Sequence, residues 1–373
     1  MGGLLCRLRT PTPVIFPFAD DAGALLFGGP TLLTLHEEVA AGCGLRLVDV
    51  DANDPLPAGC KALIARDVVV SAAALRRALE LGSARARPLR ATVKQGTPLF
   101  TASTRLLDVV GDLAIPLWAG PLPGKIPAAL EADDVVVADE DGAVVTDTAP
   151  LGAAPHQLFI ADVTRLLGRP SHWLHVLELS LAAARTRLRD PERVRHKGKR
   201  RPRIHPTAYV HNSVLGAGVR VEAHASVVDS VVGADVIVAD HTVIWGSVIG
   251  ERCRTLVDTH LRRVVAMPGS TLSNLDMQDA IFGREVFVTT GVAFFHDGPG
   301  RNVVVDGKDS GRAVLGGAIG ARSVLGSRAL FRCGVALPSR LLVVARPEEA
   351  VGKIDEASMS RAAVRFGDRA RDV

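Results

Sequence analysis

Two histidines in the C-terminal half have the chemistry of a general base. His296 lies in the stretch FFHDGPGRN, next to the carboxylate of Asp297. An imidazole is the group that most often removes a proton during catalysis, and loops that project from a rigid scaffold often carry such groups. We therefore predict that His296 is a base and that Asp297 orients it. His260, in an irregular stretch between Thr255 and Asp279, is the second candidate.

Two cations follow this loop. Lys308 and Arg312 stand on either side of the sequence DSG. Ammonium and guanidinium groups suit phosphate oxygens, and Arg can hold two of them at once. We predict that Lys308 and Arg312 bind phosphate.

Other polar residues have a purely structural explanation as well as a functional one. His224 and His241 stand at the same position of two successive repeats and could share a metal ion or an anion. Two ligands alone make a poor site, however, and stacking at the surface is the simpler hypothesis. Asp49 and Asp51, in the run VDVDAND, could hold Mg²⁺, but such a run between apolar segments is more often a loop.

A glycine pair in the N-terminal half is the single candidate there for a phosphate-binding loop. Gly28 and Gly29 lie in LLFGGPTLLTL, between two apolar runs. The pair lacks the Gly-x-Gly spacing of such loops, and no Arg or Lys follows it. A plain turn is the alternative.

The elements that would position these groups are clearest between Ile204 and Ile249, where the sequence repeats with a constant period. Three phrases, NSVLG, DSVVG and GSVIG, end at Gly216, Gly233 and Gly250. Aliphatic residues open steps of six, six and five residues, which is the pattern of a hexapeptide-repeat β-helix. Each coil is predicted to stack on the next at the strand spacing of ~4.8 Å. The stacked sets are predicted to be Val210, Val227 and Ile244, and Leu215, Val232 and Ile249. We predict that the three glycines occupy equivalent turns with positive φ.

The N-terminal half, 1–185, predicts an α/β layer structure. Short apolar runs at 13–18, 45–50, 62–70 and 134–138 are the expected strands. A helix is expected from Ser71 to Leu81, with Ser71 as its N-cap, and another from Ser171 to Leu188.

Composition and charge limit the function classes. The chain has 373 residues and 47% hydrophobic content, enough for two domains. The segment 185–203 holds ten Lys or Arg against Asp190 and Glu192, so the basicity of the chain lies in one segment. No aromatic residue interleaves these charges, which disfavours nucleic-acid binding and favours a solvated linker. Five cysteines without CxxC spacing and the absence of a long apolar run lead us to expect a cytoplasmic protein without a membrane span. The expected domains are 1–185, a linker at 186–203, the β-helix at 204–345 and a tail with a short helix at 346–373.

One family resembles the chain. The repeats, together with VDGKDSGRAVLGGAIGARSVLGSRALFRCGVALP from Val305 to Pro338, resemble sugar-phosphate nucleotidyltransferases whose C-terminal half is a left-handed β-helix. In particular, it resembles the bifunctional N-acetylglucosamine-1-phosphate uridylyltransferase/glucosamine-1-phosphate acetyltransferase group and its archaeal-type relatives. The resemblance is strong over 204–345 and faint over 1–185. It implies a left-handed β-helix, a nucleotidyltransferase-like N-terminal domain, a homotrimer, acyl-CoA (acetyl-CoA) as donor and a sugar phosphate or nucleotide-sugar as partner. It also implies Mg²⁺ if the N-terminal domain is active. The donor would lie along the last coils, against Lys308, Arg312, Gly317, Ala318 and Ser327.

The chain departs from this family at both sites. Alignment on Asp279 and Gly283 places Ser273 where acetyltransferase members have their histidine base, and the G-x-G-T-R nucleotide loop is missing. Three hypotheses remain open: an acyl-CoA-dependent acyltransferase, a sugar-1-phosphate nucleotidyltransferase, and a non-catalytic trimeric scaffold or regulatory homologue.

Overall fold

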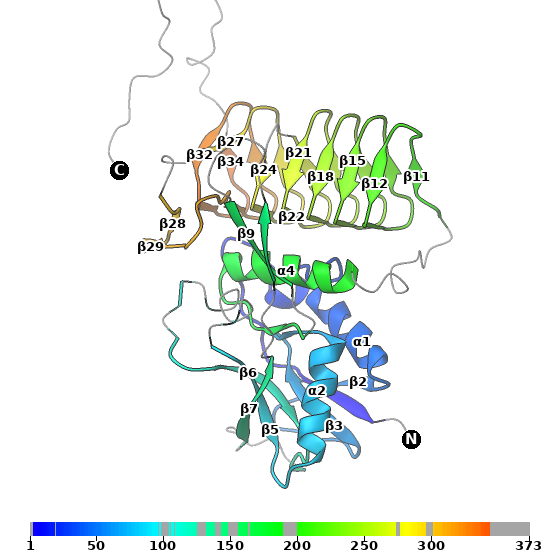
Figure 1. Cartoon of the computed structure of the whole chain (residues 1–373), viewed down its shortest axis with the longest axis vertical. Coiled ribbons are helices and arrows are strands. Elements are labelled where there is room, and N and C mark those ends of the chain that lie inside the picture. Colours follow the sequence, from blue (N-terminus) through cyan, green and yellow to red (C-terminus); the bar gives the residue numbers. More distant parts are fainter. Residues whose placement is uncertain are drawn as a thin grey trace, which may run out of the picture.

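The protein is described by a computed structural model that covers residues 3–18, 20–95, 97, 104, 106–107, 109–124, 132–138, 143–147, 156–162, 165–188, 200–273, 277–295 and 301–343. It has an α/β half and a parallel β-helix, with helix α4 (Trp173–Leu188) between them (Figure 1).

A mixed sheet forms the base of the α/β half. Its order is β2-β1-β3-β6-β5-β7, and β6 alone runs antiparallel to its neighbours. The strands are β1 (Leu4–Leu8), β2 (Arg46–Val50), β3 (Cys60–Ala65), β5 (Leu89–Val93), β6 (Leu113–Ala119) and β7 (Asp133–Ala138). Helices α1 (Leu32–Gly42) and α2 (Ala72–Ser83) and the 3-10 turn η1 (Ala22–Ala24) accompany it. Two small antiparallel pairs complete this half: β4 (Val69–Val70) with β10 (Leu167–Gly168), and β8 (Ala143–Asp147) with β9 (His156–Asp162).

Most of the elements predicted in this half are confirmed. Strands β2 and β7 match the expected runs within a residue, and the apolar run 62–70 divides into β3 and β4. The Ser71 hydroxyl accepts the N–H of Ala74, as an N-cap should. Helix α4 starts two residues after the expected position.

The strand expected at 13–18 is wrong. Pro13 and Pro17 have no N–H to give a strand ladder, and only an isolated bridge joins Val14 to Asp21. The side chains of Val14 and Phe16 are 64% and 60% exposed. The apolar run with its two prolines is therefore a loop, which buries Ile15 and Phe18 in the core and exposes Val14 and Phe16.

The β-helix is a prism with three faces, each a stack of short parallel strands. The β11 face contains β11 (Arg203–Ile204), β14 (Arg220–Val221), β17 (Ile237–Val238), β20 (Arg254–Thr255), β23 (Thr271–Leu272), β26 (Phe287–Val288), β31 (Val324–Leu325) and β34 (Leu342–Val343). The β12 face contains β12 (Tyr209–His211), β15 (Ser226–Val228), β18 (Val243–Trp245), β21 (His260–Arg262) and β24 (Met277–Gln278), and farther along the pair β27 (Ala293–Phe295) and β32 (Leu330–Arg332). The β13 face contains β13 (Val214–Leu215), β16 (Val231–Val232), β19 (Val248–Ile249), β22 (Val265–Ala266), β25 (Ile281–Phe282), β30 (Ala318–Ile319) and β33 (Ala336–Leu337).

The predicted register of the coils is confirmed. Val210 pairs with Val227 and Val227 with Ile244, and the set from Leu215 to Ile249 stacks in the same way. The inward aliphatic side chains form a core of their own. One coil could not bury this surface alone, so the repeats stabilise one another.

The backbone angles at the corners of the prism show that the predicted positive φ of the repeat glycines is wrong. Positive φ is found at corner residues, mostly not glycine, and these recur at the coil period, as in Asp235 (57°) and Arg252 (57°). Gly216, Gly233 and Gly250 do occupy equivalent places, but their φ is not positive. They lack side chains for another reason. A Cβ on Gly233 would lie 2.6 Å from the backbone nitrogen of Glu251 in the next coil.

Replacing Gly233 by Ala should therefore destabilise the β-helix through overpacking. The neighbour is backbone and cannot rotate away, so we expect a loss of about 1–3 kcal/mol in the free energy of unfolding. Chemical denaturation would measure it, with Gly124→Ala as control, because nothing lies within 4 Å of a Cβ at Gly124. Equal midpoints for the two variants would contradict this account of the repeat glycines.

Helix α4 is buried between the two halves and contributes to an apolar cluster that they share. Every residue from Trp173 to Ala184 is buried, which is typical of a helix enclosed on all sides. It lies against β19 and β22 of the β13 face. Outward side chains of that face, such as Val248 and Val265, belong to the same apolar cluster as the α/β half. The β13 face is therefore covered, whereas the β11 and β12 faces lie away from α4.

Among the helices that the structure describes, none combines the length and apolar character needed to cross a bilayer.

Candidate functional site

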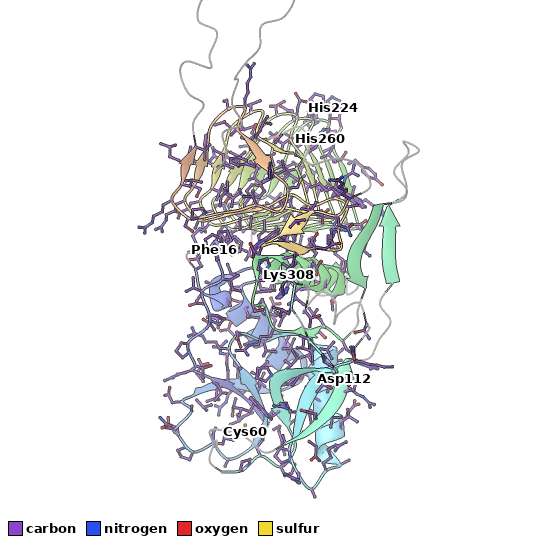
Figure 2. All side chains as sticks on the ribbon, turned by 90° about the vertical axis from the view of Figure 1, so that its left-hand side faces the viewer. Phe16, Cys60, Asp112, His224, His260 and Lys308 are labelled. Atoms are coloured by element: carbon purple, nitrogen blue, oxygen red, sulfur yellow. The ribbon has the colours of Figure 1, made fainter. Side chains whose placement is uncertain are left out.

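The described chain from Arg301 to β30 leaves the prism and lies against the α/β half. Its hairpin, β28 (Val304–Val305) and β29 (Lys308–Asp309), packs next to α4. His172 and the Asp306 carboxylate lie 3.0 Å apart, and the ammonium group of Lys308 donates to the carbonyl of Leu106 at 2.9 Å. Lys308 is exposed beside the helix in Figure 2, but it contacts the α/β half. This segment therefore joins the two halves, and the prediction that Lys308 binds phosphate remains untested.

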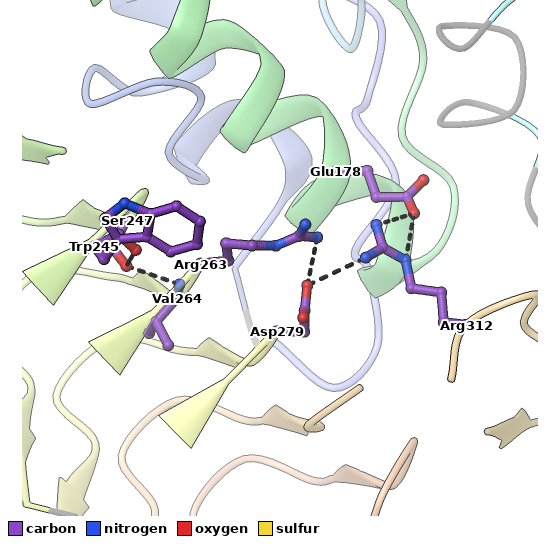
Figure 3. A network of polar contacts seen from close by, with 7 residues as sticks. All are labelled: Glu178, Trp245, Ser247, Arg263, Val264, Asp279 and Arg312. Atoms are coloured by element: carbon purple, nitrogen blue, oxygen red, sulfur yellow. Dashed lines mark hydrogen bonds and ion pairs between the residues drawn. The ribbon is translucent and has the colours of Figure 1, made fainter. Parts of the chain in front are cut away.

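Arg312 lies in a buried network of ion pairs. Its guanidinium donates to Oε1 of Glu178 at 2.7 and 3.1 Å and to Oδ1 of Asp279 at 3.2 Å. Asp279 also pairs with Arg263, and Figure 3 shows the four side chains meeting between α4 and a corner of the prism. All four are at most 5% exposed. The structure thus places Arg312 in a buried ion-pair network and gives no support to the predicted contact with phosphate.

The network is balanced in charge. Burial lowers the pKa of Arg263 to about 10, so this guanidinium is still protonated at neutral pH. Two arginines thus meet two carboxylates in a place closed to water. Burying a charged group is costly unless it is paired with an opposite charge. The ion pairs therefore stabilise the contact between α4, the corner of the prism and the projecting segment only while all four side chains are present.

Of the residues on the last coils that were predicted to contact the acyl donor, two are buried and one is exposed. Gly317 and Ala318 are buried, and Ala318 belongs to the cluster that contacts the α/β half. A Cβ on Gly317 would lie 2.6 Å from the carbonyl of Val335. Both residues are packed inside the protein, so the structure gives no support to a contact with the donor. Ser327 is exposed in a turn after β31 and remains a prediction.

The first predicted base and its orienting carboxylate, His296 and Asp297, lie outside the described residues. Both therefore stay predictions. Ser273, at the family's histidine position, is 4% exposed, and its hydroxyl lies 3.4 Å from that of Thr290. A buried serine hydroxyl at this place cannot act as the missing base.

The candidates in the α/β half are used for packing and pairing. Gly28 and Gly29 have φ of 69° and 117°. A Cβ on Gly28 would lie 2.7 Å from the backbone of Ala183 in α4, and one on Gly29 would lie 2.8 Å from Val231 of the prism. The pair is therefore the tight turn that lets three elements approach, and not a phosphate loop.

The two aspartates are likewise occupied. Asp49 accepts two hydrogen bonds from Arg7, at 2.6 and 3.1 Å, and these lower the pKa of its carboxyl group. Asp51 pairs with Arg9 at 3.4 Å. The described part of the chain holds no group of three or more potential metal ligands. The proposed Mg²⁺ site at Asp49 and Asp51 has no support.

His224 and His241 stack at the corner between the β11 and β12 faces. Their ring centroids are 5.0 Å apart and the rings are 19° from parallel. Both are exposed, on the side of the prism away from the α/β half, as Figure 2 shows for His224. This confirms the surface stacking.

His260 lies on the β12 face, in β21, and its side chain is exposed. Arg262 follows two residues later on the same strand and is also exposed, so both point outward. The Arg262 guanidinium carbon lies 5.7 Å from the ring centre of Trp245, its register partner in the preceding coil. The β12 face thus places an imidazole, a guanidinium and an indole together.

Sequence reasoning missed Trp245 and Arg262. Both stand in the repeat, one coil apart, at the second outward position of their strands. Their alternation with inward Ile244 and Leu261 was the signal that could have identified them as neighbours.

Comparison with known proteins adds resemblances but no assignment. No protein-family model matches the chain. No curated protein matches it either. The Caulobacter crescentus protein PerB, solved with CoA and GDP-perosamine, is 15% identical over 92% of this chain and 95% of its own, with a TM-score of 0.16. A mutant of perosamine N-acetyltransferase from that organism gives 14% identity with the same coverage and a TM-score of 0.18. A Bacillus cereus protein classed as an acetyltransferase is 14% identical over 40% of this chain and 72% of its own, also with a TM-score of 0.18. Likenesses this weak assign no function to the chain.

Proposed function

We propose that the protein is an acyl-CoA-dependent acyltransferase that modifies an amino group of a sugar nucleotide, with its site on the β-helix. The observation that carries this proposal is the exposed imidazole of His260 on a rigid strand of the β12 face. A base must be reachable by substrate and held by its scaffold. Among the histidines predicted as bases, His260 is the one whose placement the structure describes.

The reaction follows from the chemistry of an imidazole. Neutral His260 takes a proton from the acceptor amine as the amine nitrogen attacks the thioester carbonyl, which forms the C–N bond. The tetrahedral intermediate then collapses, the C–S bond breaks, and the departing thiolate of CoA takes up a proton. His296 with Asp297 stays the alternative base, as the sequence predicts.

The proposed handedness and oligomeric state both concern the β-helix. We expect the left-handed prism that the resemblance implies, and a homotrimer in which the flat β11 face, which lies away from α4 and carries exposed apolar residues, packs against a second copy. On this face Phe287 is 42% and Leu342 is 64% exposed. Closed cyclic packing would cover such surface. Nucleotidyl transfer is not proposed, because Gly28, Asp49 and Asp51 are engaged elsewhere.

A non-catalytic scaffold is the second candidate. The observation that favours it is the use of Arg312, Gly28 and Gly29 for contacts between the two halves. A protein that keeps the fold but has lost its chemistry would use residues in this way.

One set of measurements separates the two. The purified protein would be incubated with acetyl-CoA and UDP- or GDP-linked amino sugars, while free thiol and acylated product are followed. We expect thiol release that depends on both substrates, and a light-scattering mass of three times the 39.3 kDa chain. A trimer without transfer to any acceptor would support the scaffold, and a monomer mass would overturn the trimer.

A further inference from the structure

We infer that Cys60 is a site of oxidation by hydrogen peroxide, and that the neighbouring Cys6 then forms a disulfide with it. The inference goes beyond the proposed function, because both thiols lie in the α/β half and neither takes part in acyl transfer. Figure 2 shows Cys60 near the end of the α/β half that lies away from the β-helix. The two cysteines are far apart in the sequence, so no short spacing pairs them.

Two neighbouring parallel strands bring the thiols together. Cys6 lies in the middle of β1, and Cys60 is the first residue of β3. The register between the strands leaves Lys61 without a partner on β1, so β3 has a bulge directly after Cys60. Cys6 belongs to a small apolar cluster, and Cys60 packs against that cluster. The sheet therefore holds the two side chains on the same face.

The two thiols are in direct contact. The Cys60 side chain leans along β3, because its thiol donates to the carbonyl oxygen of Ala62 at 3.3 Å. In this position it also forms a hydrogen bond with the thiol of Cys6. That hydrogen bond lowers the pKa of Cys60, and the same contact, together with burial, raises the pKa of Cys6. Cys60 is therefore the sulfur that ionises, and Cys6 is the thiol that donates to it.

Exposure gives the two sulfurs different roles. Cys6 is fully buried, whereas Cys60 is half-buried and directly follows an exposed turn at 58–59. Peroxide therefore reaches Cys60 first. Cysteines that respond to oxidants combine a low pKa, access to solvent and a second thiol nearby, and Cys60 meets all three conditions. Cys253 is the contrasting case, because burial raises its pKa to about 11.

The oxidation has two steps. The Cys60 thiolate attacks one oxygen of hydrogen peroxide, the O–O bond breaks, and the departing oxygen takes up a proton and leaves as water. This gives the sulfenic acid of Cys60. The sulfur of Cys6 then attacks the sulfenic sulfur, the S–O bond breaks, and the hydroxyl group leaves with the Cys6 proton as a second water. The two thiols thus lose two electrons and two protons, and peroxide is reduced to water.

The position of Cys60 in its strand favours the second step. The two sulfurs have to move from hydrogen-bond contact to the ~2.05 Å of a disulfide. Cys60 is the first residue of β3, between an exposed turn and a bulge, where the backbone is less constrained than inside the sheet. Cys60 therefore makes the movement, while Cys6 stays fixed in β1.

Peptide mapping of the full chain tests the inference. The reduced protein would be treated with hydrogen peroxide, alkylated without a reductant, digested and analysed by mass spectrometry. We expect the loss of two of the five free thiols and a linked pair of peptides that contain Cys6 and Cys60. Cys60→Ser should leave Cys6 reduced. Cys43→Ser is the matched control, since Cys43 is also a half-buried thiol of the α/β half, and this variant should still form the Cys6–Cys60 disulfide.

The two steps can be separated with Cys6→Ala. In this variant the sulfenic acid of Cys60 should persist and be trapped by dimedone, whereas the wild type should be labelled much less because the disulfide removes it. Oxidation of Cys43 or Cys333 before Cys60, or equal dimedone labelling in the wild type and Cys6→Ala, would overturn the inference. The mapping of the wild type needs no variant, so a folding defect in Cys6→Ala leaves the test intact. None of these readouts depends on acyl transfer.

Discussion

Replacement of Asp279 by Asn should lower the free energy of unfolding by about 3–5 kcal/mol. Asp279 neutralises Arg263 and shares Arg312 with Glu178, and all four side chains are buried at the junction of α4 and the prism. Removal of one carboxylate leaves two guanidinium charges in a closed site with a single acid. Because three segments meet there, the loss should appear as a lower midpoint in denaturant for both halves of the protein.

An exposed ion pair is the control for this prediction. Glu285 and Arg322 pair at 2.9 Å on the surface, with both side chains more than half exposed. Such pairs contribute about 0–1 kcal/mol, so Glu285→Gln should change little. If Asp279→Asn were no more destabilised than Glu285→Gln, the buried network would not join the two halves in the way described.

Replacement of His260 by Ala should lower the rate of acyl transfer by about 10² to 10⁴. The imidazole is proposed to take the proton of the attacking amine, so its loss should reduce kcat with a smaller effect on KM. Rates with acetyl-CoA and a saturating amino sugar nucleotide would measure the effect, and circular dichroism would confirm that the fold is kept.

Two further histidine variants make this result specific. His241→Ala removes an exposed imidazole that stacks on His224, so its rate should stay within about twofold of the wild type. His296→Ala tests the base predicted from sequence. Full activity in His260→Ala together with loss in His296→Ala would return the role to the projecting segment.

The sequence by itself determined the β-helix. Each coil repeats the last at a constant period, so the inward aliphatic residues, the small side chains near the corners and the vertical register follow from local periodicity. The same local logic identified helix α2, its cap at Ser71 and the stacking of His224 on His241. The predicted reason for the repeat glycines was wrong, however. A side chain is excluded at these positions by the close approach of the next coil, and not by a positive φ.

The tertiary structure decided which polar residues are available for chemistry. Arg312 meets Glu178 across 134 positions of sequence, and Gly28 in the N-terminal half meets Ala183 of α4. Such contacts cannot be predicted from the periodicity of the sequence, because they depend on how α4 packs on the β13 face. Arg312 has the residue type and spacing of a phosphate ligand, yet burial with two carboxylates fixes it as a structural ion. Residue type and local spacing set which chemistry a side chain can do, whereas long-range packing sets whether a substrate can reach it.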